Sequence, residues 1–243
     1  MVTTSKKILI IIPAYNEAPC IGDVIDNIKK NAPFADIVVV NDGSIDKTAA
    51  MAKAKGVVVL SLPYNMGIGG AVQTGYKYAQ EIGYEIAVQV DADGQHPVDQ
   101  INKLLNTIIE DQADMVIGSR YIQANEREPS FVREAGKWML AKALTLLTGQ
   151  RITDSSSGFR AANRRVIYLF SHVYPRDYPE PESIAFLIRE GLRVKEIPVT
   201  MNGRISGQSS ISLIAGIYYV IKVILAVFVD RFEKRIMLKE VME

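Results

Sequence analysis

Gln89-Val90-Asp91-Ala92-Asp93-Gly94-Gln95-His96-Pro97 is the stretch around which the rest of the chain is organised. The apolar run Ile86-Ala87-Val88 precedes it, and its own glycine and proline end any regular element. Side chains two residues apart in an extended segment point to the same side, so Asp91 and Asp93 can converge at the end of a strand. Carboxylates placed this way repel each other unless a cation lies between them. The stretch is therefore typical either of a site for a hard cation that faces a phosphate-bearing ligand or of a simple acidic turn.

Composition indicates an ordinary globular protein. The chain has 243 residues, of which 48% are hydrophobic and 23% charged, with a net charge of +1. This length and balance predict one domain and give no support for a general nucleic-acid binder. Cys20 is the only cysteine, which excludes a disulfide framework and a thiolate metal cluster. The apolar run that starts at Ile8 is cut short by Pro13, so we interpret it as a strand and not as a secretory signal.

Strands and helices alternate along the first half. Apolar runs predict strands at 7–12, 36–40, 57–62, 84–90 and 114–118, and helical spacing predicts helices at 21–30, 47–55, 71–82 and 98–110. This order is typical of an α/β, Rossmann-like fold with a mainly parallel sheet flanked by helices. Such sheets bind ligands at the carboxyl ends of their strands. The polar clusters at 14–17, 41–46 and 91–96 each follow a strand, which indicates a functional site there.

The second half is less regular. We expect a helix at 131–147, a polar loop at 151–160, an irregular proline-containing segment at 174–182, a helix at 183–190 and a strand at 192–198. Residues 211–229 contain a single charged side chain, Lys222, and their length is close to the ~20 residues that span a bilayer. We therefore predict that 211–243 form a long apolar helix with a basic flank. It would associate with a membrane, pack in an oligomer contact, or pack on its own domain.

Three motifs, in their order and spacing, resemble the signature of glycosyltransferase family 2. They are Ile12-Pro13-Ala14-Tyr15-Asn16-Glu17, the segment Val40–Thr48 and the segment Asp91–Pro97. Further segments are similar to the polyprenol-phosphate sugar transferases, the dolichol-phosphate mannosyltransferase group: 65–70, 118–120, 154–160 and 204–210. The resemblance implies a GT-A fold and a catalytic domain over 1–210. Its nucleotide-sugar half would end near residue 120, and its acceptor half would follow.

The resemblance also assigns roles on the donor side. It implies that Asp91, Asp93 and Gln95 hold a Mg²⁺ or Mn²⁺ ion, which supports the departing diphosphate as a Lewis acid. Asp42 corresponds to a contact with the nucleobase or ribose, although it could instead cap a helix. The other residues expected to line the nucleotide-sugar site are Pro13, Ala14, Tyr15, Glu17, Gly69 and Ala92.

On the acceptor side, the resemblance implies that Arg120, Arg133 and Arg204 serve phosphate groups, for which a guanidinium offers forked donors. Asp154 and Ser155 would line the acceptor pocket. Asp93, Glu182 and Arg204 are the expected catalytic residues. Glu180 and Glu182 are both candidates for a general base, and Glu182 is preferred because it begins a predicted helix. An acceptor that is already an anion needs little deprotonation, so Glu182 could orient a substrate instead.

We therefore expect a metal-dependent inverting glycosyltransferase. It would move a hexosyl unit from a UDP- or GDP-sugar to a polyprenyl phosphate, undecaprenyl or dolichyl, at the cytoplasmic face of the membrane. A membrane-protein partner or a homo-oligomer is compatible with this expectation. The alternatives are an enzyme that extends a polysaccharide on a sugar hydroxyl and a non-catalytic nucleotide-sugar-binding partner of a membrane protein. A sugar nucleotidyltransferase would need a glycine-rich basic loop just after the first strand. This chain has Pro13-Ala14-Tyr15-Asn16-Glu17 there, which argues against that class.

Overall fold

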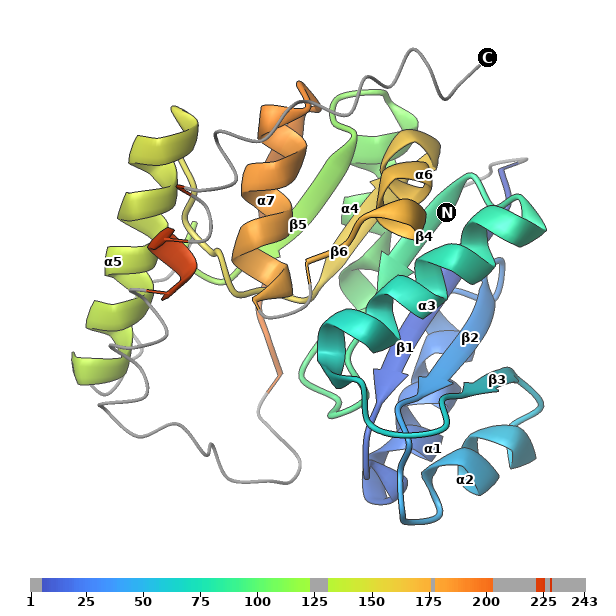
Figure 1. The fold of residues 1–243 in the computed structure, drawn as a ribbon. Helices are drawn as coiled ribbons and strands as arrows, with labels where there is room; N and C mark the ends of the chain where they lie inside the picture. Colours follow the sequence, from blue (N-terminus) through green and yellow to red (C-terminus); the bar gives the residue numbers. More distant parts are fainter. Residues whose placement is uncertain (1–5, 123–130, 176–177, 203–221, 226–227, 229–243) are drawn as a thin grey trace.

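The computed structural model describes residues 6–122, 131–175, 178–202, 222–225 and 228, without the side chains of 131–138. Figure 1 shows these residues as a twisted sheet with helices on both faces. The strands are β1 (Ile8–Ala14), β2 (Asp36–Asn41), β3 (Val58–Ser61), β4 (Ile86–Gln89), β5 (Met115–Ser119), β6 (Arg160–Asn163) and β7 (Val194–Pro198). The helices are α1 (Ala18–Asn31), α2 (Thr48–Ala54), α3 (Gly67–Ile82), α4 (Ile101–Ile109), α5 (Phe131–Thr148), α6 (Arg164–His172) and α7 (Pro179–Arg189), and a 3₁₀ turn (Val98–Gln100) precedes α4.

The strands form one sheet in the order β3-β2-β1-β4-β6-β5-β7. β1 pairs in parallel with β2 and β4, and β5 pairs in parallel with β7. β6 alone is antiparallel, to both β4 and β5. Its first residue, Arg160, lies opposite Gln89 at the end of β4. The start of β6 therefore lies at the same edge of the sheet as the carboxyl ends of the parallel strands. The predicted α/β fold with a mainly parallel sheet is confirmed.

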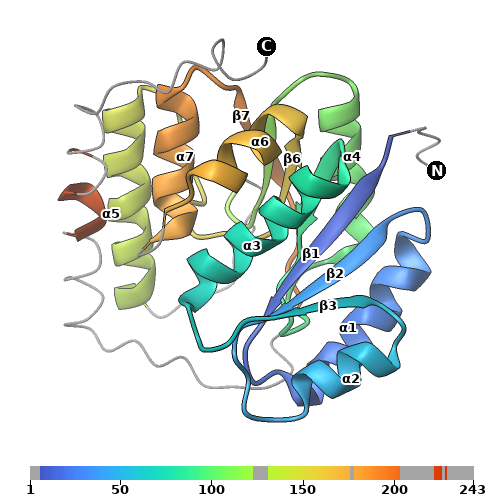
Figure 2. The same ribbon diagram turned by 45° about the vertical axis from the view of Figure 1, so that its right-hand side comes forward.

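Two hydrophobic clusters cover the two faces of this sheet. One contains apolar side chains of α1, α2 and α4, and the other contains those of α3, α5, α6 and α7. Figure 2 shows α1 and α3 on opposite sides of β1 and β2. All seven residues of β1 are buried, as expected for a strand that is covered on both faces. A Cβ on Gly75 would lie 2.3 Å from Ile11 Cγ2, so glycine lets α3 pack directly on β1.

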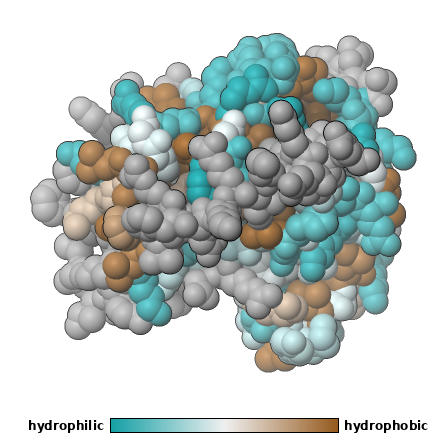
Figure 3. Space-filling view, turned by 45° about the horizontal axis from the view of Figure 1, so that its top comes forward, coloured by the Kyte–Doolittle hydropathy of each residue, from teal (hydrophilic) through white to brown (hydrophobic). Residues whose placement is uncertain are grey.

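Figure 3 shows one side of the outer surface. On this side, hydrophilic and hydrophobic residues are interspersed over the part of the chain that the structure describes.

The structure corrects two boundaries in the second half. Segment 174–182 was expected to be irregular, but α7 begins at Pro179 instead of Ser183. Proline is tolerated in the first helical turn, where its missing N–H would have no partner within the helix. The polar loop was expected to run to Arg160, whereas this residue starts β6, and α6 follows directly. Asn163 caps α6 by accepting hydrogen bonds from Arg165 N at 3.0 Å and Val166 N at 3.2 Å.

The predicted apolar helix at 211–229 and its basic flank lie outside the described residues except for 222–225 and 228. Of these, Val223 is fully buried and belongs to the cluster formed by α3, α5, α6 and α7. Within the described part of the chain, no helix combines the length and the apolar character needed to cross a bilayer.

Candidate active site

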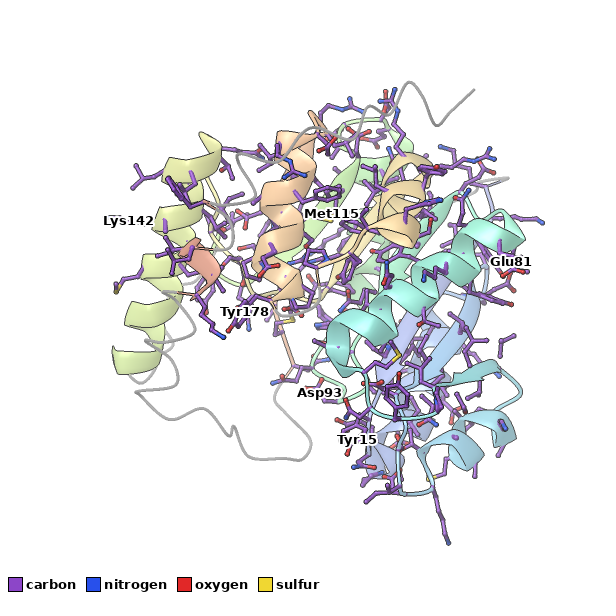
Figure 4. The ribbon with its side chains drawn as sticks, viewed as in Figure 1. Tyr15, Glu81, Asp93, Met115, Lys142 and Tyr178 are labelled. Atoms are coloured by element: carbon purple, nitrogen blue, oxygen red, sulfur yellow. The ribbon has the colours of Figure 1, made fainter. Side chains whose placement is uncertain are left out.

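A cavity of about 290 Å³ opens at the carboxyl ends of β1, β2 and β4. Figure 4 shows Tyr15 and Asp93 close together at this end of the molecule, while Glu81 lies at the far end of α3. The cavity is lined by Pro13, Ala14, Tyr15, Glu17, Asp42, Asn65, Gly67, Ile68, Ala71, Asp91, Ala92 and Asp93. The structure thus brings together eight of the residues expected on the donor side. Gly69 lies buried in the first turn of α3 and is not part of this wall.

Hydrogen bonds join the loops that follow β1 and β2 into one wall of the cavity. Ser44 Oγ accepts from Asn16 N at 3.0 Å, and Asn16 Oδ1 accepts from Ile45 N at 3.0 Å. Thr48 Oγ1 accepts from Glu17 N at 2.8 Å. Asn16 has a φ of 55°, a left-handed conformation that asparagine adopts more readily than most residues. The two loops therefore fix each other without a ligand.

Asp42 is only 3% exposed, and its Oδ1 accepts a hydrogen bond from Met66 N at 2.7 Å. This bond fixes the turn that enters α3. Asp42 therefore does not cap α2, the alternative considered above. Asp46 Oδ1 instead accepts a hydrogen bond from the N–H of Thr48, the first residue of α2, at 2.9 Å.

Asp91 is held by two neighbouring side chains. His96 Nδ1 accepts from Asp91 N at 2.9 Å, which leaves the ring proton on Nε2, 3.3 Å from Asp91 Oδ2. Gln89 Nε2 donates to Asp91 Oδ1 at 3.3 Å. The His96 ring is buried and packs against Phe159, with 5.2 Å between ring centroids. His96 belongs to the stretch Gln89–Pro97 around which the chain is organised, but no pattern in the sequence indicates that it orients Asp91.

The carboxylates in the loop after β4 suit a cation that binds together with a phosphate-bearing ligand. Asp91 and Asp93 both line the cavity, and Asp93 Oδ1 accepts from Gln95 N at 3.0 Å. Among the described residues, no three His, Cys, Asp or Glu side chains gather around one cation position. Mg²⁺ in particular is often bound by only one or two carboxylates and completed by substrate phosphates and water. Such a site suits a cation bound together with a diphosphate.

Gly158 packs directly against the Asp91 carboxylate. A Cβ at this position would lie 3.0 Å from each Asp91 carboxylate oxygen and 2.9 Å from Gln89 Nε2. Glycine therefore allows a close approach between the loop before β6 and the side chains at the end of β4 and in the loop after it. The sequence analysis assigned no role to Gly158.

On the acceptor side, Arg120 and Asp154 form a forked ion pair. Arg120 Nε and Nη2 donate to the two Asp154 carboxylate oxygens at 2.7 Å each, and Nη2 also donates to Ser156 Oγ at 2.8 Å. Burial raises the pKa of the Asp154 carboxyl, but the hydrogen bonds and charge of Arg120 outweigh it, so the pKa lies below its usual value. Asp154 is thus an anion that orients Arg120. Ser155 beside it is buried.

Glu196 on β7 is a further residue that the sequence analysis did not single out. Its carboxylate accepts hydrogen bonds from Thr153 and from Asp154 N. Its place in a strand of mixed polar and apolar residues gave no signal for this role.

Arg160, the first residue of β6, and Glu180, in the first turn of α7, are joined by a hydrogen bond. The Arg160 guanidinium is 1% exposed and donates to Ser157 O at 2.7 Å, Ser183 Oγ at 2.7 Å and Glu180 O at 2.9 Å. Burial raises the pKa of Glu180, the Arg160 charge lowers it, and the Asp91 charge raises it further. Glu180 thus lies beside Arg160, to which its carbonyl oxygen is hydrogen-bonded.

The remaining predicted site residues are Glu182, Arg133 and Arg204. Glu182 is half-buried in the first turn of α7, where its role as a base stays a prediction. Arg133 lies on α5, but its side chain is outside the described residues, and so is the whole of Arg204. Their roles toward an acceptor phosphate also stay predictions.

Comparisons with known proteins agree with this geometry. A sequence model of the family described as Glycosyl transferase family 2 matches residues 9–169. The UDP-N-acetylglucosamine–dolichyl-phosphate N-acetylglucosaminyltransferase of Methanococcus voltae is 34% identical over 214 residues, 80% of this chain and 85% of that protein. The undecaprenyl-phosphate mannosyltransferase of Micrococcus luteus is 30% identical over 220 residues, 85% of this chain and 88% of that protein.

A solved structure is similar in fold. It is glucosyl-3-phosphoglycerate synthase from Mycobacterium tuberculosis in complex with Mn²⁺, UDP-glucose and phosphoglyceric acid. The TM-score is 0.72 at 24% sequence identity, and the match covers 92% of this chain and 80% of that one.

Proposed function

The chain belongs to glycosyl transferase family 2, and we propose that it transfers a hexosyl unit from a UDP- or GDP-sugar to a polyprenyl phosphate, with inversion at the anomeric carbon. Relatives that match most of its length carry out sugar transfer to dolichyl and undecaprenyl phosphate. The enzyme class is therefore glycosyltransferase.

The observation that carries the proposal is that one loop contacts both sides of the site. Gly158 lies against Asp91 on the donor side, and Asp154 of the same loop holds Arg120 on the acceptor side. A donor in the cavity and an anionic acceptor beside Arg120 would then lie next to each other. Transfer between two bound substrates requires this proximity.

The chemistry needs little from a protein base. An oxygen of the acceptor phosphate attacks the anomeric carbon, and the bond from that carbon to the diphosphate oxygen breaks. The acceptor oxygen is already anionic, so no strong base has to remove a proton. A divalent cation, when bound, supplies Lewis-acid stabilisation of the departing diphosphate. Asp91 and Asp93 would hold that cation, Mg²⁺ or Mn²⁺, with Gln95 beside them.

The protein side chains that we assign to the reaction act by binding and orientation. Asp42 and Tyr15 would contact the nucleoside, which is supported by the presence of both residues in the lining of the cavity. Arg120, with Arg133 and Arg204, would hold the acceptor phosphate. Because the acceptor is a membrane lipid, we also propose that the enzyme works at the cytoplasmic face of the membrane.

A product assay tests this function directly. The purified protein is incubated with Mn²⁺ or Mg²⁺, each UDP- or GDP-hexose in turn, and a short polyprenyl phosphate, and lipid-linked sugar is measured. We expect product with one donor and a loss of at least a hundredfold in Asp93→Asn. Asp99→Asn, at an exposed position in the 3₁₀ turn, is the matched control and should retain activity.

The alternatives predict other outcomes. Transfer only to a sugar hydroxyl would favour the polysaccharide-extending enzyme. A protein that binds donor but neither transfers nor hydrolyses it would be the non-catalytic partner. Either result would refute the proposed acceptor.

A further inference from the structure

Glu196 connects β7 to the acceptor side of the site. β5 and β7 are parallel neighbours, with Ile117 opposite Glu196. Both Glu196 carboxylate oxygens accept hydrogen bonds from the loop before β6. Oε2 accepts from Thr153 N and from Thr153 Oγ1 at 2.8 Å each, and Oε1 accepts from Asp154 N at 2.7 Å. Glu196 therefore fixes the backbone of two consecutive residues, the second of which is the partner of Arg120.

Asp154 carries this restraint to Arg120. Besides the two side-chain contacts at 2.7 Å, Arg120 N donates to Asp154 Oδ2 at 3.1 Å. The Asp154 side chain is completely buried, whereas that of Arg120 is 31% exposed. A second link joins the same segments, because Ser119 Oγ and Thr153 Oγ1 lie 2.7 Å apart. The position of the guanidinium thus depends on a chain of contacts that begins at Glu196.

The hydrogen-bond pattern requires a carboxylate at this position. Three donors converge on Glu196, and its two oxygens accept all of them. A glutamine of the same size has one acceptor oxygen and an NH₂ group that can only donate. Glu196→Gln would therefore place an NH₂ group against a backbone N–H, leaving that donor without an acceptor. A side chain needed only for packing would tolerate this exchange.

We propose that Glu196 is a positioning residue for the acceptor phosphate: it holds Asp154, which in turn holds the Arg120 guanidinium in its binding orientation. The inference rests on the proposed function, since it takes Arg120 to bind that phosphate. Glu196 itself touches neither substrate. Its effect should therefore appear in acceptor binding and not in donor binding.

Steady-state kinetics of the full chain test this role. Glu196→Gln should raise the KM for a short polyprenyl phosphate about tenfold, which corresponds to about 1.4 kcal/mol, and leave the KM for the nucleotide-sugar within twofold. Glu81→Gln makes the same chemical change on the exposed end of α3 and should leave both constants unchanged. An acceptor KM equal to that of the wild type overturns the proposal, and so does an equal rise in both KM values.

A double-mutant cycle tests the route through Arg120. Arg120→Lys keeps the charge but loses the forked contact with Asp154. If Glu196 acts through Arg120, adding Glu196→Gln to Arg120→Lys should change the acceptor KM by less than twofold. Two independent tenfold effects that multiply would contradict the proposal.

A second variant and a comparison with the wild-type product complete the test. If Glu196→Gln does not fold, Thr153→Val removes one donor to Glu196 and should raise the acceptor KM in the same direction by about threefold; no change would overturn the proposal. Failure of the proposed function looks different, because wild-type protein would then make no lipid-linked product although it binds the nucleotide-sugar. If only the Glu196 inference is wrong, the wild-type protein still makes lipid-linked product.

Discussion

Gly158→Ala is expected to disturb the cation site without replacing either carboxylate that we propose to hold the cation. The new Cβ would lie 3.0 Å from both carboxylate oxygens of Asp91 and 2.9 Å from Gln89 Nε2. Ordinary carbon–oxygen contacts lie at about 3.3–3.6 Å, so the space is short by roughly half an ångström. Gly158 does not have a positive φ, so its backbone conformation is open to alanine, and the cost arises from the contact alone.

The surroundings of Asp91 decide how large the effect is. His96 and Gln89 both hold the carboxylate, so a shift of half an ångström stretches contacts that are already at 3.3 Å. Overpacking of this kind costs about 1–3 kcal/mol, and a misplacement of ~1 Å in an active site can cost about a hundredfold in rate. We expect kcat/KM to fall about tenfold to a hundredfold and the Mn²⁺ concentration for half-maximal activity to rise.

The assay is a Mn²⁺ titration of sugar transfer at saturating donor and acceptor, together with thermal unfolding of each variant. Gly22→Ala is the control, because the nearest atom to its new Cβ is Lys55 Cε at 3.3 Å, the end of a flexible side chain. Gly22 lies within α1, where alanine is favoured by up to about 1 kcal/mol, so this variant should be active and slightly more stable. A folded Gly158→Ala protein with wild-type turnover and Mn²⁺ dependence would refute the reasoning.

Two predictions concern pH. Burial raises the pKa of Asp114, but hydrogen bonds from Arg193 and Asn163 outweigh it and leave the pKa below 3.8. The ionised Asp114 carboxylate therefore stabilises the fold above pH 3.8, and this contribution is lost as the pH falls through the lower pKa of the folded state. Unfolding temperatures measured from pH 6 to pH 2.5 should therefore depend less on pH in Asp114→Asn than in the wild type. The pKa shift of Glu180 has the opposite sign, because burial raises the pKa of its carboxyl above 4.5. The ionised form of Glu180 therefore destabilises the fold above that pH. Glu180→Gln should unfold a few degrees higher than wild type at pH 8, with the difference shrinking toward pH 4; equal unfolding temperatures at pH 8 would contradict this.

The core strands of the sheet were predictable because their signal is local. β1, β2 and β4 are short apolar runs, and such runs indicate strands that are buried on both faces. β6 was missed because its sequence, Arg-Ala-Ala-Asn, contains no β-branched or aromatic residue. Its strand conformation depends on β4 and β5, which flank it and come from elsewhere in the sequence.

The donor side of the site was also predictable from local signals. Polar residues that follow parallel strands gather at one edge, which is how Asp42 and Asp91 come to share a cavity. The contacts that orient these groups were not predictable. Glu196, Gly158 and His96 acquire their roles from atoms of distant segments or from the path of one loop, and no pattern in the chain specifies those distances. The resemblance singled out both Arg120 and Asp154 but not that they bind each other.

The antiparallel insertion of β6 has a consequence for how the chain folds as it is synthesised. β5 leaves the ribosome before either of its neighbours in the sheet, since β6 and β7 follow it in the sequence. Until β6 arrives, the edge of β4 is open, and an open apolar edge can pair with another chain. Pairings between distant segments also form slowly. We therefore expect the edge of β4 to stay open until β6 is synthesised, and this is the stage at which pairing with another chain would compete with folding.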